Sequence, residues 1–368
     1  MADSMWLIIL GVVLISFGLS TIYIVIKISN FGFIKKIAEE KKWLKNIISF
    51  IIVLIIFLIF SYILSVINAI IMLLHLTIFL LIYGLIFRLI KRIRKKEFKY
   101  YYQGWLSIFT TVVYLSIGFY LCHNVWQTNY EIKTNKDIKQ LRIALIADSH
   151  IGTTFDGEGF KKHLKEIEKQ KPDMIVIAGD YVDDSTKKKD LITATKYLGN
   201  IKTKYGIFYS YGNHDEGYFN RRDFTKEELR SILEENNINI LADEVKLVDN
   251  FYIIGRKDKS LGNRKEMSEL VKGLDKDKYM IVIDHEPSDY KNEEEAGVDL
   301  VLSGHTHGGQ LFPLPIIGGL FFQVNDKTYG YERRSSTDFI VTSGISDWEI
   351  DFKTGTKSEY VIIDVKQK

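Results

Sequence analysis

Short apolar runs that each end in a polar cluster recur five times after residue 140 of this 368-residue chain. A short apolar run bounded by turn residues is typical of a buried strand. Open α/β sheets carry their chemistry on loops at the carboxyl ends of such strands. The pattern therefore predicts a sheet that presents a group of functional loops. The runs are Arg142–Ala147, Met174–Ala178, Ile207–Tyr211, Tyr279–Ile283 and Val298–Ser303.

The polar clusters share histidine, aspartate and asparagine, often beside glycine. These side chains supply nitrogen and oxygen ligands for hard or borderline divalent metals, and glycine lets the backbone approach a ligand closely. A single His-x-His pair indicates little, but five of the eight histidines lie in these clusters. The set therefore indicates a functional site. The clusters are Asp148–His150, Gly179–Asp183, Gly212–Asp215, Asp284–Pro287 and Gly304–Gln310.

Segments with helical apolar spacing alternate with these runs. Strand–helix alternation favours an α/β fold with a largely parallel sheet. Three later apolar segments are less regularly interleaved with helices, which favours a second sheet. The expected helices are Gly157–Lys169, Lys187–Leu198, Thr225–Glu235 and Arg264–Leu274, and the later strands are Phe251–Ile254, Asp338–Thr342 and Glu359–Val365.

The first 126 residues are dominated by Ile, Leu, Phe and Val, and about 20 apolar residues are enough for a helix to cross a bilayer. A cleaved signal peptide is the alternative for the first run, but a basic region is missing and the run is too long. The long stretch Ile47–Phe87 is predicted to form two spans with a turn near Ser65 and Asn68. We expect spans at about 6–26, 47–66, 69–88 and 105–126, a polar linker at 127–140 and a catalytic domain at 141–368.

The connections between these spans differ in charge. Lysines and arginines are concentrated in residues 27–45 and 88–99, whereas the N-terminal tail and the turn at Asn68 carry none. The positive-inside rule then places both basic loops in the cytoplasm and the catalytic domain outside. Binding to anionic lipid headgroups is an alternative role for these residues that puts them on the same side.

Overall charge and cysteine content add little to this assignment. The net charge of +3 averages two unlike halves and indicates no nucleic-acid partner. The single cysteine, Cys122, excludes an internal disulfide and leaves the compartment open.

The five clusters, in their order, resemble the calcineurin-like metallophosphoesterase family. The resemblance runs from about Leu141 to the C-terminus, and the Gly-Gly-Gln ending with the apolar N-terminus looks most like the bacterial membrane-associated subgroup. It implies an α/β fold, a two-sheet αββα sandwich, here preceded by an all-α transmembrane region of about four helices. Members include protein phosphatases, nucleases, nucleotide phosphodiesterases and lipid-precursor pyrophosphatases, so the resemblance does not specify a substrate.

The same resemblance implies a site with two divalent metal ions and a hydroxide between them as the nucleophile. Manganese, iron and zinc all suit the mixed ligand set. Asp180 would bridge the two ions. By resemblance, the first ion is held by Asp148, His150, Asp180 and His307, and the second by Asp180, Asn213, His285 and His305.

Four other residues have different expected roles. His214 matches the family position that stabilises the transition state or protonates the leaving oxygen, and Asp215 is expected to hold its tautomer. Asp183 either supports a metal ligand or caps the following turn. Lys353 stands near where the subgroup often carries an arginine, and it could meet a phosphate as a point charge.

The apolar loop Leu311–Phe322 follows the last ligand histidines. On a membrane protein such a loop could touch lipid, although packing under the second sheet is the favoured reading.

Together these features predict a membrane-anchored phosphoesterase that hydrolyses a phosphomonoester, phosphodiester or pyrophosphate bond, with an envelope or lipid-linked substrate. The alternative is a membrane sensor or scaffold whose phosphoesterase-like domain binds ligand without turnover. Every ligand position is filled, which favours the enzyme.

Overall fold

The structure is a computed structural model that describes residues 2–218, 221–312 and 325–368. The expected apolar loop Leu311–Phe322 therefore lies almost wholly outside the described residues. The chain divides into two compact units, Met1–Gly118 and Phe119–Lys368.

The first unit is helical. Four of its helices are long and apolar enough to cross a membrane, which confirms the expected number. The stretch Ile47–Phe87 is divided between two of them, as expected. Helix α3 ends at Ile63, and the Ser65 side chain caps the start of α4 by accepting a hydrogen bond from the Asn68 amide. The helices are α1 (Ala2–Ile28), α2 (Gly32–Ile37), α3 (Lys42–Ile63), α4 (Val66–Arg94) and α5 (Tyr102–His123).

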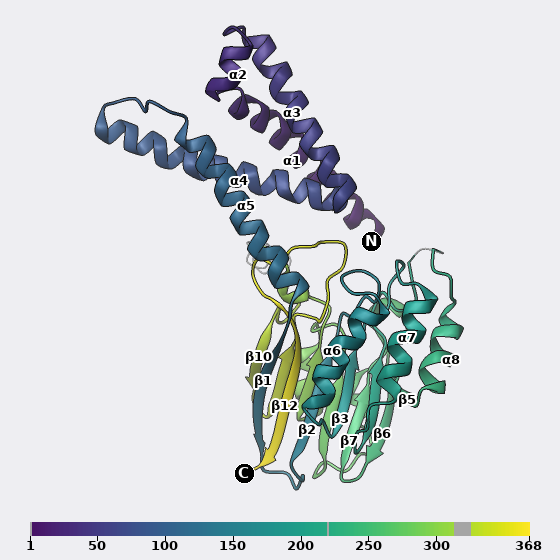
Figure 1. The fold of residues 1–368 in the computed structure, drawn as a ribbon. Helices are drawn as coiled ribbons and strands as arrows, with labels where there is room; N and C mark the ends of the chain where they lie inside the picture. The colour runs from purple at the N-terminus through teal and green to yellow at the C-terminus, as the bar shows by residue number, and fades with distance from the viewer. Residues whose placement is uncertain (1, 219–220, 313–324) are drawn as a thin grey trace. The chain divides into compact units, whose positions relative to one another are not determined.

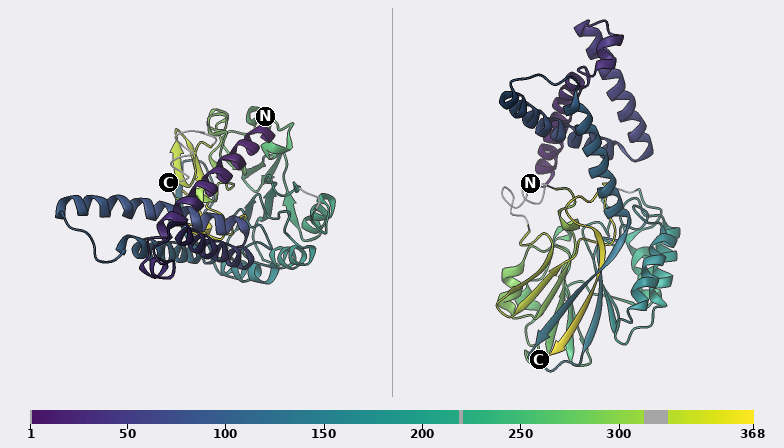
Figure 2. Two further views of the ribbon diagram at one scale, coloured as in Figure 1. Left: turned by 90° about the horizontal axis from the view of Figure 1, so that it is seen from above. Right: turned by 60° about the vertical axis from the view of Figure 1, so that its left-hand side comes forward.

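The second unit contains two six-stranded sheets packed face to face (Figures 1 and 2). The order is β1-β12-β2-β3-β4-β5 in the first sheet and β10-β11-β9-β8-β7-β6 in the second. The strands of the first sheet are β1 (Val125–Thr134), β2 (Leu141–Ile146), β3 (Met174–Ala178), β4 (Gly206–Ser210), β5 (Ile238–Ile240) and β12 (Ser358–Gln367). Those of the second are β6 (Glu244–Val248), β7 (Phe251–Gly255), β8 (Tyr279–Ile283), β9 (Leu300–Ser303), β10 (Gly330–Arg334) and β11 (Thr337–Val341).

Both faces of the central strands are buried, as their unbroken apolar runs require. On β2, Ile143 and Leu145 pack between the two sheets, whereas Ala144 and Ile146 pack under the helices of the first sheet. Those helices are α6 (Gly157–Lys169), α7 (Lys188–Gly199) and α8 (Lys226–Glu235). The short helices α9 (Met267–Leu270) and α10 (Tyr290–Ala296) cover the second sheet. This is the αββα sandwich that the sequence predicted.

Two local predictions are wrong. Glu359–Val365 was expected in the second sheet, but it lies in β12, antiparallel to β2 in the first sheet. Most of the expected linker at 127–140 is strand β1, which pairs in parallel with β12 over ten residue pairs. β1 lies at the edge of its sheet and only one of its ten residues is buried, so its polar sequence resembled that of a linker.

Ile132 tests whether β1 is part of the sandwich. Its side chain is 3% exposed and packs between the sheets. Replacing it with Ala should lower the free energy of unfolding by about 2–5 kcal/mol because the change leaves a cavity. The exposed neighbour Lys133 is the matched control, and Lys133→Ala should change stability by about 0.5 kcal/mol or less. Equal, small effects of both changes in denaturant unfolding would show that this segment is a linker.

Candidate metal centre

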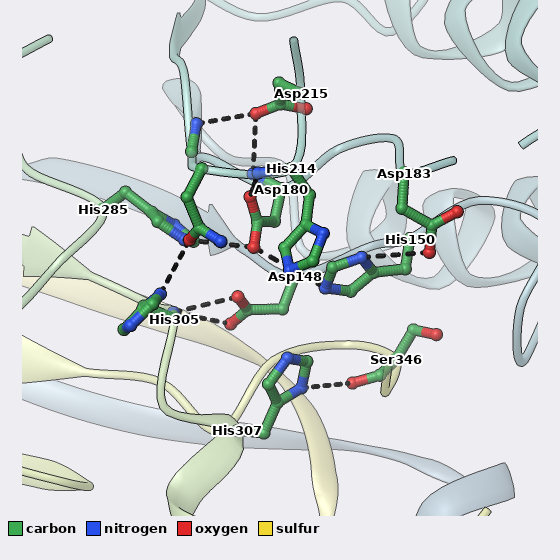
Figure 3. A network of polar contacts seen from close by, with 12 residues as sticks. Asp148, His150, Asp180, Asp183, His214, Asp215, His285, His305, His307 and Ser346 are labelled. Carbon is green, nitrogen blue, oxygen red and sulfur yellow. Dashed lines mark hydrogen bonds and ion pairs between the residues drawn. The ribbon is translucent and has the colours of Figure 1, made fainter. Parts of the chain in front are cut away.

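The five polar clusters converge at the carboxyl ends of neighbouring strands. Those after β2, β3 and β4 come from the first sheet, and those after β8 and β9 come from the second. Because the sheets pack face to face, the side chains meet across the end of the sandwich (Figure 3). All seven predicted metal ligands lie in this one cluster.

Six of the seven form two groups, and within each group the ligand atoms lie within 4.8 Å of one another. The first group is Asp148, His150 and His307, and the second is Asp180, His285 and His305.

Asn213 joins the second group. Its Oδ1 lies 3.1 Å from His285 Nε2 and 2.8 Å from His305 Nδ1. Amide oxygens and imidazole nitrogens are both metal ligands, so a divalent cation placed among these three atoms could bind all of them. The family resemblance likewise assigns these three residues to the same ion.

Asp180 lies between the two groups. Its Oδ2 is 3.1 Å from His285 Nε2 in the second group and 3.7 Å from His150 Nε2 in the first. Its Oδ1 accepts a hydrogen bond from the His214 amide. One carboxylate oxygen thus faces ligands of both groups, as a bridging ligand must.

Each of three histidines is oriented through its Nδ1 atom, which leaves Nε2 for a metal. His285 Nδ1 is 2.8 Å from the Ala178 carbonyl oxygen. His150 Nδ1 is 3.2 Å from Asp183 Oδ2, and His307 Nδ1 is 3.2 Å from Asp347 Oδ1.

Asp183 and Asp347 therefore orient predicted ligands and are not themselves predicted to bind the metal. Asp183 combines the two roles that the sequence left open, because its other oxygen accepts hydrogen bonds from Ser185 and closes the turn. Asp347 was missed. It follows β11 as the other clusters follow their strands, but it stands without a histidine beside it.

The backbone of the cluster is strained. Five predicted ligands have positive φ, a conformation that non-glycine residues adopt uncommonly and that gathers at functional sites. Gly212 allows the loops to approach, because a Cβ there would lie 2.3 Å from Asp180 Oδ1. The five ligands are Asp148 (52°), His150 (36°), Asp180 (50°), His305 (71°) and His307 (48°).

The carboxylates give the cluster a strong attraction for positive charge. Burial opposes protonation of His150, but the nearby carboxylates of Asp183 and Asp180 outweigh it and raise its pKa to about 8. Burial likewise opposes protonation of His285, yet Asp180 raises its pKa well above the ordinary value. Burial together with the charge of His285 lowers the pKa of His305 to about 4.

The donor set fits divalent metal ions. His150 is fully buried, and its Nε2 has no hydrogen-bond partner among the described residues. A buried polar atom without a partner is costly, and a cation held between His150 and Asp180 would satisfy it. The mixture of imidazole, carboxylate and amide oxygen suits manganese, iron or zinc.

Asp215 does not have its expected role. Its two oxygens accept hydrogen bonds from the amides of Asp180, Tyr181, Val182 and Gly212 at 2.7–3.1 Å. His214 Nδ1 has no hydrogen-bond partner among the described residues. The prediction that Asp215 holds the tautomer of His214 is therefore wrong, because that carboxylate is already used to hold two ligand loops together.

His214 lies beside the cluster without joining either group. Its ring centroid is 5.2 Å from that of His150. Two partly exposed aromatic rings, Tyr218 at 5.0 Å and Trp348 at 4.7 Å, flank it. Burial lowers the pKa of His214 to about 4. No sequence signal pointed to the two aromatic residues, since neither belongs to a motif.

Lys353 does not meet the expected phosphate. It is fully buried, and its Nζ donates to the Ser343 carbonyl oxygen at 2.6 Å and lies 3.4 Å from Asp347 Oδ1. A buried ammonium needs such partners. These contacts therefore tie Lys353 to the loop that carries Asp347 and stabilise that loop. The prediction that Lys353 could contact substrate is wrong.

Comparison with known proteins agrees with this geometry. The profile described as calcineurin-like phosphoesterase matches residues 141–309. An uncharacterised metallophosphoesterase of Campylobacter jejuni is 30% identical over 269 residues, which cover 72% of this chain and 68% of that protein. One from Helicobacter pylori is 29% identical over 274 residues, covering 69% and 71%. A Danio rerio transmembrane protein with metallophosphoesterase domain is 28% identical over 254 residues, covering 64% and 55%. The chain therefore belongs to the calcineurin-like metallophosphoesterase family.

Asp183 offers a test of the support behind His150. Asp183→Asn should lower metal affinity about 10–100-fold, because the amide no longer attracts the His150 Nδ1 proton with a full charge. Titration of metal-free protein with manganese measures this. Asp190→Asn is the matched control, since its carboxylate accepts a hydrogen bond from the Gly157 amide, outside the loops that carry the predicted ligands. Equal affinity of the two variants would contradict the role assigned to Asp183.

Proposed function

We propose that this protein is a membrane-anchored phosphoesterase that uses two divalent metal ions to hydrolyse a phosphomonoester, phosphodiester or pyrophosphate bond. The observation that carries the proposal is the position of the Asp180 carboxylate between two groups of ligands. The first ion would be held by Asp148, His150, Asp180 and His307, and the second by Asp180, Asn213, His285 and His305.

When bound, a metal pair neutralises the charge of a phosphoester, lowers the pKa of water and clamps the oxygens of the reacting phosphorus. The residues of the chain have the remaining tasks. Asp183, Asp347 and the Ala178 carbonyl orient three histidines, and Asp215 holds the loops that carry Asp180 and Asn213. His214 lies within reach of the cluster and would hydrogen-bond the leaving oxygen or a charged oxygen of the transition state.

A sensor or scaffold that binds ligand without turnover is the alternative. It would tolerate loss of a ligand, whereas here all seven positions are filled and two carboxylates hold the histidines in place. Metal content combined with turnover of an aryl phosphodiester separates the two functions. A screen of nucleotide, lipid and wall-polymer phosphoesters would then identify the substrate.

The four apolar helices support a multi-pass membrane protein, as does the similarity to the Danio rerio transmembrane protein. Two spans between the basic loops put both loops on the cytoplasmic side. An even number of spans supports a catalytic domain on the outside, where envelope lipids, wall polymers and extracellular nucleotides would be the accessible substrates.

Asp180→Ala should abolish turnover and reduce bound metal more than any other single ligand change, because the Asp180 carboxylate faces both groups. Metal analysis and phosphodiester hydrolysis measure the two effects. The proposed site is wrong if the variant keeps near-wild-type activity in added manganese.

His214→Asn should keep its metal content and lower kcat, by about 10²–10⁴-fold if the ring acts as a general acid. The loss should be greater for substrates with poor leaving groups, because these need more help to depart. Loss of metal, or an equal effect on good and poor leaving groups, would argue against this role.

The membrane orientation can be tested by labelling. Lys41 and Lys189 are exposed, and each can be replaced by Cys in a Cys122→Ser background. A membrane-impermeant maleimide applied to intact cells should label position 189 and spare position 41. The opposite pattern would place the active site in the cytosol.

A further inference from the structure

A cavity of about 630 Å³ lies within the helical unit. Its walls come from the end of α1 and the start of α2 on one side, and from the second half of α4 and the start of α5 on the other. The two basic segments of the sequence, residues 27–45 and 88–99, thus contribute to one cavity although α3 and most of α4 separate them in the chain.

The cavity is lined by five basic side chains and one acidic side chain. The acidic residue, Glu97, pairs with Lys91. The basic residues therefore outnumber the carboxylate that could neutralise them, and their combined charge favours an anion in the cavity. They are Lys27, Lys35, Arg88, Lys91 and Lys99.

Aromatic side chains form another part of the wall. The buried Phe31 ring meets Tyr101 and Trp105 edge to face, with centroids 5.0 and 5.1 Å apart. Tyr101 and Gln103 also line the cavity and add polar side chains to its wall.

We propose that this cavity binds the phosphate headgroup of an anionic phospholipid. Phosphate oxygens accept charge-assisted hydrogen bonds from lysine and arginine, and basic pockets between membrane helices are suited to such headgroups. Tyrosine and tryptophan are enriched at the depth where headgroups meet acyl chains. The site rests on insertion of the four helices in a membrane and is independent of hydrolysis at the metal centre.

Binding of phosphatidylglycerol and phosphatidylcholine to the full-length protein in a neutral detergent, followed by native mass spectrometry, tests the site. Lys27→Gln/Lys35→Gln removes two lining charges. Lys36→Gln/Lys42→Gln is the matched control, because both of its residues are exposed, do not line the cavity and belong to the same basic segment. Phosphatidylglycerol affinity should fall roughly tenfold more in the lining variant than in the control, given the strength of hydrogen bonds to charged groups.

Two further arms identify the ligand and exclude misfolding. Lys27→Arg/Lys35→Arg should keep wild-type phosphatidylglycerol binding, and phosphatidylcholine binding should be the same in all variants. Equal losses in the lining and control variants, or equal affinity for both lipids, would overturn the proposal. Displacement of phosphatidylglycerol by equimolar inorganic phosphate or glycerol phosphate would assign the cavity to a soluble phosphate and overturn the lipid. Lipid binding is measured without substrate turnover. A failure of the proposed lipid site is therefore distinguishable from a failure of the proposed hydrolysis.

Discussion

The Asp215 carboxylate holds the candidate metal centre together. It accepts four backbone hydrogen bonds, three from the loop after β3 and one from the loop after β4. These loops carry Asp180 and Asn213, so the carboxylate sets the distance between the proposed bridging ligand and the second group. Burial and the charge of Asp180 raise the pKa of Asp215 to about 6, and hydrogen bonds from four amides favour its charged form. The strained backbone of the ligands persists because such contacts hold it from several sides.

The strands and the clustering of the seven proposed ligands were predictable from the sequence because each has a local signal. A buried strand is a short apolar run, and β3 and β8 have the predicted bounds. The seven proposed ligands belong to ordered motifs on the loops that follow such strands. Helix α6 was also predicted at its observed bounds, since its apolar spacing is strong and Asp156 caps its first turn.

The incorrect predictions share a different cause, which is that the deciding contacts join residues far apart in the sequence. β1 has a polar sequence and becomes a strand only because β12, more than 200 residues later, pairs with it. The assignment of Asp215 to His214 followed their adjacency, but folding gives its oxygens closer donors in the backbone. Asp347 and Lys353 form an ion pair behind His307, and no motif contains both. Burial of Lys353 could not be read from a stretch as polar as 351–355.

The central claim is that Asp180 bridges two metal ions held by two groups of ligands. Anomalous X-ray scattering from crystals grown with manganese tests it most directly, because it locates the ions independently of activity. The account predicts two anomalous peaks about 3.5–4 Å apart, one beside Asp148, His150 and His307 and the other beside Asn213, His285 and His305, with the Asp180 carboxylate between them. A single peak, or two peaks without Asp180 in contact with both, would contradict it.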